Sequence, residues 1–156
     1  SFITIQEEQR HIESYLKIQQ FRYQDTLAYN IDIDKALYNF TIPKLLLQPL
    51  VENALVHGIR GKRGKGRISV TGRLEGGNIV FCVTDDGVGM DEEKLYNLRK
   101  ASVAGSTQSA NIAAFGVGNV NERIHIYYGE NYGLFFKSQP DVGTTARVLI
   151  PARNVS

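Results

Sequence analysis

The pattern of apolar and polar residues predicts a chain that begins with a helix and continues into a strand. Thr4 followed by Glu7 is typical of a capping box, in which each side chain accepts a hydrogen bond from the other residue's backbone N–H. We therefore expect a helix from this point to about Tyr23, with a broad apolar face that needs a partner. Between 27 and 33 every second residue is apolar, which is the period of a half-buried strand.

A second helix is expected at 43–58. Pro43 suits a first helical turn, apolar residues continue to His57, and Gly58 suits the end of the helix. Pro49 would lie inside this helix and should kink or loosen its first turns, because proline lacks a backbone N–H.

The second half of the chain predicts alternating hairpins and helices. Hairpin strands are expected at 68–71 and 79–83, helices at 91–101 and 117–128, and closing strands at 132–138 and 144–150. Residues 101–114 are small and polar, which favours a mobile loop. Helices alternating with hairpins indicate an α+β fold, a two-layer α/β sandwich.

Composition narrows the class of protein. A chain of 156 residues with 42% hydrophobic and 22% charged residues fits one globular domain. The net charge of +2 is too balanced to indicate a polyanionic partner, and a single cysteine excludes an internal disulfide, which favours a reducing compartment. Apolar stretches stay short of the roughly 20 residues that span a bilayer.

Asn53 is the first candidate for chemistry, because it is an amide in the otherwise apolar helix LLLQPLVENALVHG. Its side-chain oxygen is a hard, neutral donor of the kind that Mg²⁺ prefers. The alternative is an asparagine on the exposed edge of a helix.

The segment Asp85-Asp86-Gly87-Val88-Gly89 directly follows an apolar strand. A carboxylate at a strand end can accept a hydrogen bond from the exocyclic amine of adenine, whereas guanine would present a carbonyl there. Gly87 and Gly89 would let the backbone approach the base. The alternative is a plain strand-to-helix turn.

A third segment, Ala114-Phe115-Gly116-Val117-Gly118, leads into a helix. Backbone N–H groups and the positive end of a helix dipole suit phosphate oxygens. The segment is not a P-loop, since no Gly-Lys-Ser/Thr follows, and taken alone it could be an ordinary turn.

Together these segments resemble the ATP-binding superfamily of gyrase, heat-shock chaperones, histidine kinases and MutL. LLLQPLVENALVHG is similar to its asparagine box, DDGVGM to its first glycine box, AFGVGNVNERI to its second, and DVGTTARVLIP to its closing strand. The exact residues of these motifs most resemble those of LytS/YesM-type sensor histidine kinases. The segment ITIQEEQRHIESYLKIQQFRY resembles the helical stretch that precedes the ATP domain in that family. The resemblance covers nearly the whole chain.

The resemblance implies a Bergerat ATP-binding fold, with a mixed, mostly antiparallel sheet, helices on one face, and Mg²⁺ and ATP as ligands. It divides the chain into a helical connector, 1–24, and a catalytic domain, 25–156. Asn53 would bind the metal, Asp85 would read adenine, and Thr144 would help hold a water against the base. Because Val56 replaces a lysine common in other histidine kinases, the negative charge of the phosphates would be neutralised by His57, Arg60 or Lys62. The implied nucleotide-binding set is Asn53, His57, Lys62, Asp85, Gly87, Gly89, Gly116, Gly118 and Thr144.

The implied activity is transfer of the γ-phosphate of ATP to a histidine on a dimerisation domain. His11, His57 and His125 do not lie in the family's phosphoacceptor context, so the acceptor is expected outside this chain. Pro49 replaces the water-activating glutamate of hydrolytic relatives, which favours a kinase over an ATPase. The implied partners are the chain's own dimerisation domain in a homodimer and a response regulator, with the domain on the cytoplasmic side of a membrane-anchored parent.

Three alternatives remain open at this stage. RGKRGKGR at 60–67 could bind nucleic acid, although it lacks the aromatic residues on which bases stack. In the family, the loop around Gly116 forms a lid over the phosphates and usually begins with a glycine. Ala114 stands at that first position here, which would stiffen the lid or mark a degenerate module that binds without chemistry. An anti-sigma type serine kinase shares the boxes, but the first helix and NVNERI favour the histidine kinase.

Overall fold

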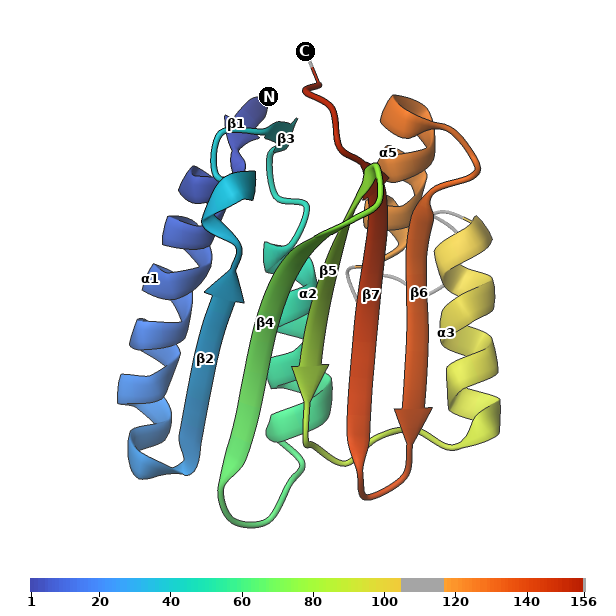
Figure 1. Ribbon diagram of the computed structural model, residues 1–156. Helices are drawn as coiled ribbons and strands as arrows, with labels where there is room; N and C mark the ends of the chain where they lie inside the picture. The colour runs from blue at the N-terminus through green and yellow to red at the C-terminus, as the bar shows by residue number, and fades with distance from the viewer. Residues whose placement is uncertain (105–116, 156) are drawn as a thin grey trace.

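The computed structural model describes residues 1–104 and 117–155, which form a five-stranded mixed sheet with helices on one face (Figure 1). The strand order is β2-β4-β5-β7-β6, with β2 and β4 parallel and every other neighbouring pair antiparallel. This confirms the expected fold class. The strands of the sheet are β2 (Leu27–Ile33), β4 (Gly66–Glu75), β5 (Asn78–Asp85), β6 (Gly133–Gln139) and β7 (Gly143–Pro151).

The helices lie behind the sheet in the view of Figure 1, and a short two-stranded sheet sits near the N-terminus. The α-helices are α1 (Ile5–Tyr23), α2 (Gln48–Asn53), α3 (Glu92–Ala104) and α5 (Gly118–Tyr128). The small sheet pairs β1 (Phe2–Thr4) with β3 (Thr41–Pro43). The described residues also form three single turns: the 3₁₀ helices η1 (Gln24–Thr26) and η2 (Lys35–Leu37), and the π-helix η3 (Ala54–Ile59).

Alternation along the strands explains the two faces of the sheet. In β4, Ile68 and Val70 are buried, whereas Arg67 before them and Arg73 after them are exposed. The same period runs through β5 and β7, so the helices cover one apolar face and the other face meets solvent.

Helix α1 begins as predicted. The Thr4 hydroxyl accepts from the Glu7 N–H at 3.1 Å, and the Glu7 carboxylate accepts from the Thr4 N–H at 3.2 Å. Ile12 and Leu16 are fully buried in the core shared with the sheet. Near the end of the helix Ile18 and Phe21 remain 61% and 87% exposed. The boundary between a connector and a catalytic domain at residue 24 stays a prediction.

The helix predicted at 43–58 begins in the wrong place, whereas its end lies one residue from the predicted one. Pro43 ends strand β3 opposite Phe2, and α2 begins only at Gln48. Pro49 therefore stands in the first turn, where a missing N–H costs no intrahelical bond, so the predicted kink is also wrong. Beyond Asn53 the helix does not stop but widens into η3, which ends at Ile59.

The remaining elements follow the predictions closely. The turn Gly76-Gly77 joins β4 to β5, and the Asp91 carboxylate accepts from the Lys94 N–H at 2.8 Å at the start of α3. Helix α3 continues to Ala104, past the predicted end near Ala101, and the rest of the predicted mobile loop lies outside the described residues. Among the helices described, none is long and apolar enough to cross a membrane.

Candidate functional site

Asp85 ends strand β5 in the middle of the sheet, only 4% exposed. Ile68 of β4 pairs with it on one side and Thr144 of β7 on the other. The Gly87 N–H donates to the Asp85 Oδ1 at 2.9 Å. The neighbouring backbone therefore holds Asp85 in place at the strand end, which is where the sequence places it; its contact with a base stays a prediction.

Burial raises the pKa of Asp85 from 3.8 to about 6. Hydrogen bonds from the backbone of Gly87 and Thr144 hold this pKa down in part, and the charge of Asp86 raises it further. At neutral pH the carboxyl is thus mostly ionised in a poorly solvated position. A hydrogen bond from a ligand N–H would stabilise such a carboxylate, because a buried acceptor is costly to leave unpaired.

Gly58 brings the helical segment η3 against Asp85. A Cβ built on Gly58 would lie 2.5 Å from the Asp85 Oδ1, and the Gly58 carbonyl accepts from the Val88 N–H at 3.1 Å. Gly87 is packed equally closely on the Gly58 backbone. The sequence predicted Gly58 only as the end of a helix, because its contact with Asp85 joins residues far apart in the chain.

Asn53 is the last residue of α2, directly before the π-helix that carries Gly58. π-Helical turns are rare and frequently accompany functional sites. The Asn53 Oδ1 is buried and has no hydrogen-bond partner among the described residues. An unpaired buried acceptor is costly, so this oxygen suits a ligand such as Mg²⁺. The neighbouring Glu52 is exposed and accepts from Gln48, so it does not share this role.

Clusters of three or more His, Cys, Asp or Glu side chains that could hold a metal do not occur in the described part of the chain. A site without such a cluster is still compatible with Mg²⁺. This ion keeps several waters and often binds only one or two protein oxygens together with oxygens of the substrate phosphates.

The last strand supports Asp85 through Gly143 and Thr144. Gly143 has a φ of +137°, and a Cβ there would overlap the Asp85 carbonyl oxygen, so glycine is required. The Thr144 hydroxyl is hydrogen-bonded to the Ser138 hydroxyl at 2.7 Å. Thr144 therefore lies beside Asp85 as expected, while its role toward a water stays a prediction. Gly143 and Ser138 were not singled out from the sequence.

The other predicted glycines occupy different places. Gly87 lies against Gly58, beside the Asp85 carboxyl. Gly89 has a φ of +66° and packs on the Gln139 carbonyl, so its small size serves the turn between β6 and β7. Gly118 is the first residue of α5, and Gly116, like Ala114, lies outside the described residues.

The side chains of Lys62 and Arg60 have different protein partners. The Lys62 ammonium lies 3.2 Å from the Asp86 carboxylate, next to the candidate site. The Arg60 guanidinium donates to the Tyr23 hydroxyl at 3.1 Å and so reaches toward α1 instead. His57 is half-buried on η3, one residue before Gly58. Lys62 is therefore the better placed of the two to approach a nucleotide at Asp85.

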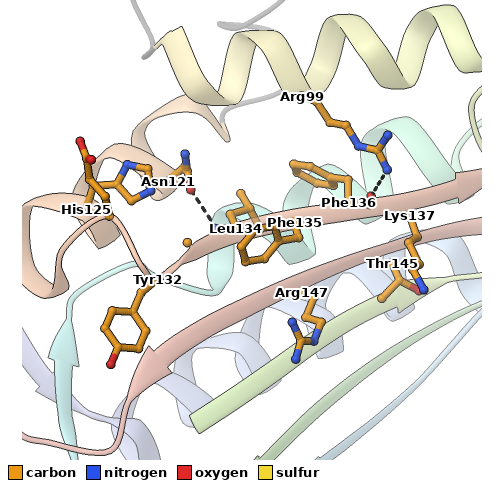
Figure 2. A pocket seen from close by; sticks show the side chains of 12 residues that line it. Arg99, Asn121, His125, Tyr132, Leu134, Phe135, Phe136, Lys137, Thr145 and Arg147 are labelled. Atoms are coloured by element: carbon orange, nitrogen blue, oxygen red, sulfur yellow. Dashed lines mark hydrogen bonds between the residues drawn. The ribbon is translucent and has the colours of Figure 1, made fainter. Parts of the chain in front are cut away.

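A separate hollow of about 820 Å³ lies along the edge strand β6 (Figure 2). Arg99 donates to the Phe136 carbonyl at 2.6 Å, and the Asn121 amide oxygen accepts from the Leu134 N–H at 2.8 Å. These two side chains occupy outward-facing backbone groups of the edge and so protect it from pairing with another chain. Of the predicted nucleotide-binding residues that the structure describes, none lines this hollow.

Comparison with known proteins agrees with this arrangement. Residues 41–154 match the family of histidine kinase-, DNA gyrase B- and HSP90-like ATPases. The sensor histidine kinase YesM of Bacillus subtilis is 34% identical over 152 residues, which cover 97% of this chain and 24% of YesM. YpdA of Escherichia coli, also a sensor histidine kinase, is 35% identical over 149 residues, which cover 96% of this chain and 24% of YpdA. The chain thus spans about a quarter of the length of these curated relatives.

Solved structures show the same fold at low sequence identity. The catalytic domain of histidine kinase ThkA has a TM-score of 0.71 and 12% identity, covering 98% of this chain and 97% of that domain. The mycobacterial sensor histidine kinase MprB has a TM-score of 0.65 and 16% identity, covering 99% of this chain and 98% of that one. From the match over residues 41–154 and the identity to sensor kinases, the chain belongs to the family of histidine kinase-, DNA gyrase B- and HSP90-like ATPases.

Proposed function

We propose that this domain binds Mg·ATP and supplies the γ-phosphate in a sensor histidine kinase. The observation that carries the proposal is the buried Asp85 carboxyl, held by backbone at a strand end and lined by Gly58 and Gly87. The ionised carboxyl accepts a hydrogen bond from the adenine amine. Guanine would place a carbonyl against the same oxygen and leave both acceptors unpaired, which selects adenine nucleotides.

Asn53 would hold the metal through its unpaired Oδ1, and Lys62, which pairs with Asp86 beside Asp85, would lie near the nucleotide. When bound, Mg²⁺ neutralises charge on the phosphates during transfer. The chain's own residues contribute positioning, which is the main demand of phosphoryl transfer. The N-terminal turn of α5, from Gly118 onward, supplies backbone N–H groups and a positive dipole end for phosphate oxygens.

The acceptor in this proposal is a histidine on a dimerisation domain, and a response regulator receives the phosphoryl group afterwards. Similarity to YesM and YpdA supports this assignment. The exposed Ile18 and Phe21 near the end of α1 offer an apolar surface on which helices of the dimerisation domain would pack. By the same similarity, the domain would face the cytoplasm in a membrane-anchored parent.

Phosphotransfer to a supplied acceptor tests this function. The purified domain, mixed with a YesM-type dimerisation domain and γ-labelled ATP, is expected to label the acceptor histidine. Without the acceptor, phosphate release should be very slow, because Pro49 stands where hydrolytic relatives carry a glutamate. Acid-labile label on the acceptor supports the kinase. ATP binding with no label would indicate a module that only binds, and rapid phosphate release would indicate an ATPase.

Replacing Asn53 with alanine should weaken ATP binding selectively in the presence of magnesium. We expect the affinity for Mg·ATP to fall about tenfold, whereas the affinity measured in EDTA changes less than about twofold. The reason is that alanine removes the oxygen for the metal and leaves Asp85 intact. Titration calorimetry in both buffers measures the difference, with exposed Glu52→Ala as the control. Equal losses in the two buffers would argue against a metal role for Asn53.

A further inference from the structure

The turn that leads into α2 has a strained backbone. Leu45 has a φ of +61°, in the left-handed region that a bulky side chain rarely adopts. Strain of this kind persists only where the surroundings hold it, and it is common at functional sites. The two following residues, Leu46 and Leu47, are fully buried in the core. The turn at 44–47 thus fixes where the short helix α2 begins.

A buried carboxylate from α1 holds one side of this turn. Glu8 is 0% exposed, although glutamate is a polar residue that is rarely buried without partners. One of its oxygens accepts from the Leu45 N–H at 3.3 Å, and the other accepts from the N–H groups of Leu47 at 2.8 Å and Gln48 at 3.3 Å. The first N–H groups of a helix lack intrahelical partners, and the side chain of Leu47 cannot cap them. Glu8 therefore caps α2 from another helix.

A guanidinium from α5 holds the other side of the turn. Arg123 donates to the Leu45 carbonyl at 3.0 Å and also to the Lys44 carbonyl. Arg123 lies five residues beyond Gly118, where α5 begins. The turn at 44–47 consequently joins three helices: α1 through Glu8, α2 through the chain itself, and α5 through Arg123.

The short length of α2 makes its starting point important for Asn53. Asn53 lies only five residues after Gln48, before the helix continues into η3, so a rotation or shift at the first turn of α2 is carried to this amide. The Asn53 Oδ1 is buried without a partner among the described residues, so neighbouring hydrogen bonds do not keep it in place. Its direction must then be set by the anchoring of α2 as a whole.

We propose that Glu8 and Arg123 are positioning residues, which clamp the strained turn and thereby aim the Asn53 amide at the metal of bound Mg·ATP. This inference rests on the proposed function. The clamp also ties α2 to α5, so the metal ligand and the phosphate-binding end of α5 keep a fixed relation. Glu8 and Arg123 act through the backbone and touch neither the nucleotide nor the metal.

The variants Glu8→Gln and Arg123→Gln test the clamp. Glutamine at position 8 keeps the shape but replaces one acceptor oxygen with an amine, and glutamine at 123 removes the guanidinium fork. We expect each variant to lose about fivefold to tenfold in affinity for Mg·ATP and less than about twofold in EDTA. Hydrogen exchange at the Leu47 amide should become faster in Glu8→Gln, before any nucleotide is added.

Two variants serve as matched controls. Glu7→Gln changes the neighbouring glutamate, which is exposed and bonds only within the capping box with Thr4. Arg153→Gln removes another guanidinium that donates to a backbone carbonyl of α5, that of Tyr127, away from the turn. Both should keep the wild-type ratio of affinities with and without magnesium. Circular dichroism establishes that each variant is folded.

A rescue variant separates strain from general destabilisation. Leu45→Gly relieves the left-handed backbone, so in the Glu8→Gln background it should recover at least about threefold of the lost Mg·ATP affinity. If the clamp positions Asn53, Glu8→Gln and Arg123→Gln should both lose affinity for ATP selectively in the presence of magnesium. Adding Leu45→Gly to Glu8→Gln should restore part of that affinity. Equal losses in the two buffers, wild-type affinity, or no recovery would each overturn the clamp. If the wild type fails to bind ATP, the proposed function itself has failed. If Asn53→Ala shows no magnesium-selective loss, Asn53 does not bind the metal, and the clamp is overturned while ATP binding stands.

Discussion

Asparagine in place of Asp85 is expected to weaken ATP binding at least tenfold, which corresponds to about 1.4 kcal/mol. The substitution keeps the shape of the side chain but turns one of its two acceptors into a donor. The remaining oxygen is occupied, because the Gly87 N–H donates to Oδ1 at 2.9 Å. The amide NH2 group of the asparagine would then face the exocyclic amine of adenine. Both groups are donors, so two buried donors would be left without an acceptor.

Calorimetric titration with ATP measures this loss, and Asp86→Asn is the matched control. Asp86 is the adjacent carboxylate, but it accepts from the Arg67 N–H at 2.7 Å and pairs with Lys62 outside the predicted contact with the base. We expect Asp86→Asn to change the affinity less than about threefold. Unchanged affinity in Asp85→Asn would show that this carboxyl does not read adenine.

The same variant should alter the pH dependence of stability. Because the pKa of Asp85 is raised to about 6 in the folded domain, its contribution to stability is fully present below pH 3.8 and is lost as pH rises through about 6. Asparagine does not titrate. The stability of Asp85→Asn relative to wild type should therefore be on the order of 1 to 3 kcal/mol higher at pH 7 to 8 than it is near pH 4. Urea unfolding across this range measures the change, and parallel curves would contradict it.

Much of the fold could be predicted because its signals are local. The Thr4–Glu7 capping box, the alternation in 27–33 and the Gly76-Gly77 turn each depend on residues a few positions apart. Asp85 could be predicted as a carboxyl at the end of a strand because an apolar segment directly precedes it. These features need no knowledge of the rest of the chain.

The misjudged helix start had a non-local cause. Pro43 is held in β3 by pairing with Phe2, and the first N–H groups of α2 are capped by Glu8, about forty positions earlier in the chain. Local propensity favoured a helix that begins at the proline, because nothing nearby in sequence reveals a cap supplied by another helix. The structural importance of Gly58 was hidden for the same reason: the atom that forbids a side chain there belongs to Asp85 on a strand.

Gly58→Ala is the second change with a large expected effect, because it inserts a methyl group between the two halves of the site. Its Cβ would lie 2.5 Å from the Asp85 Oδ1 and 2.6 Å from its Cγ, closer than real atoms approach. Asp85 is fixed between β4 and β7, so either η3 or the carboxyl must move. We expect at least a tenfold loss of ATP affinity and a destabilisation of about 1 to 3 kcal/mol, as for other overpacked cores.

Gly61→Ala provides the matched control, because a Cβ there would meet Val88 at 3.4 Å, an ordinary contact. Calorimetry and urea unfolding should leave this variant close to wild type. A double-mutant cycle identifies the cause: in an Asp85→Ala background the carboxyl is gone, so Gly58→Ala should cost less stability than it does in wild type. Additive losses would mean that the methyl group disturbs η3 itself and not its contact with Asp85. A smaller cost would instead tie the glycine after the asparagine box to the carboxyl that we propose reads adenine.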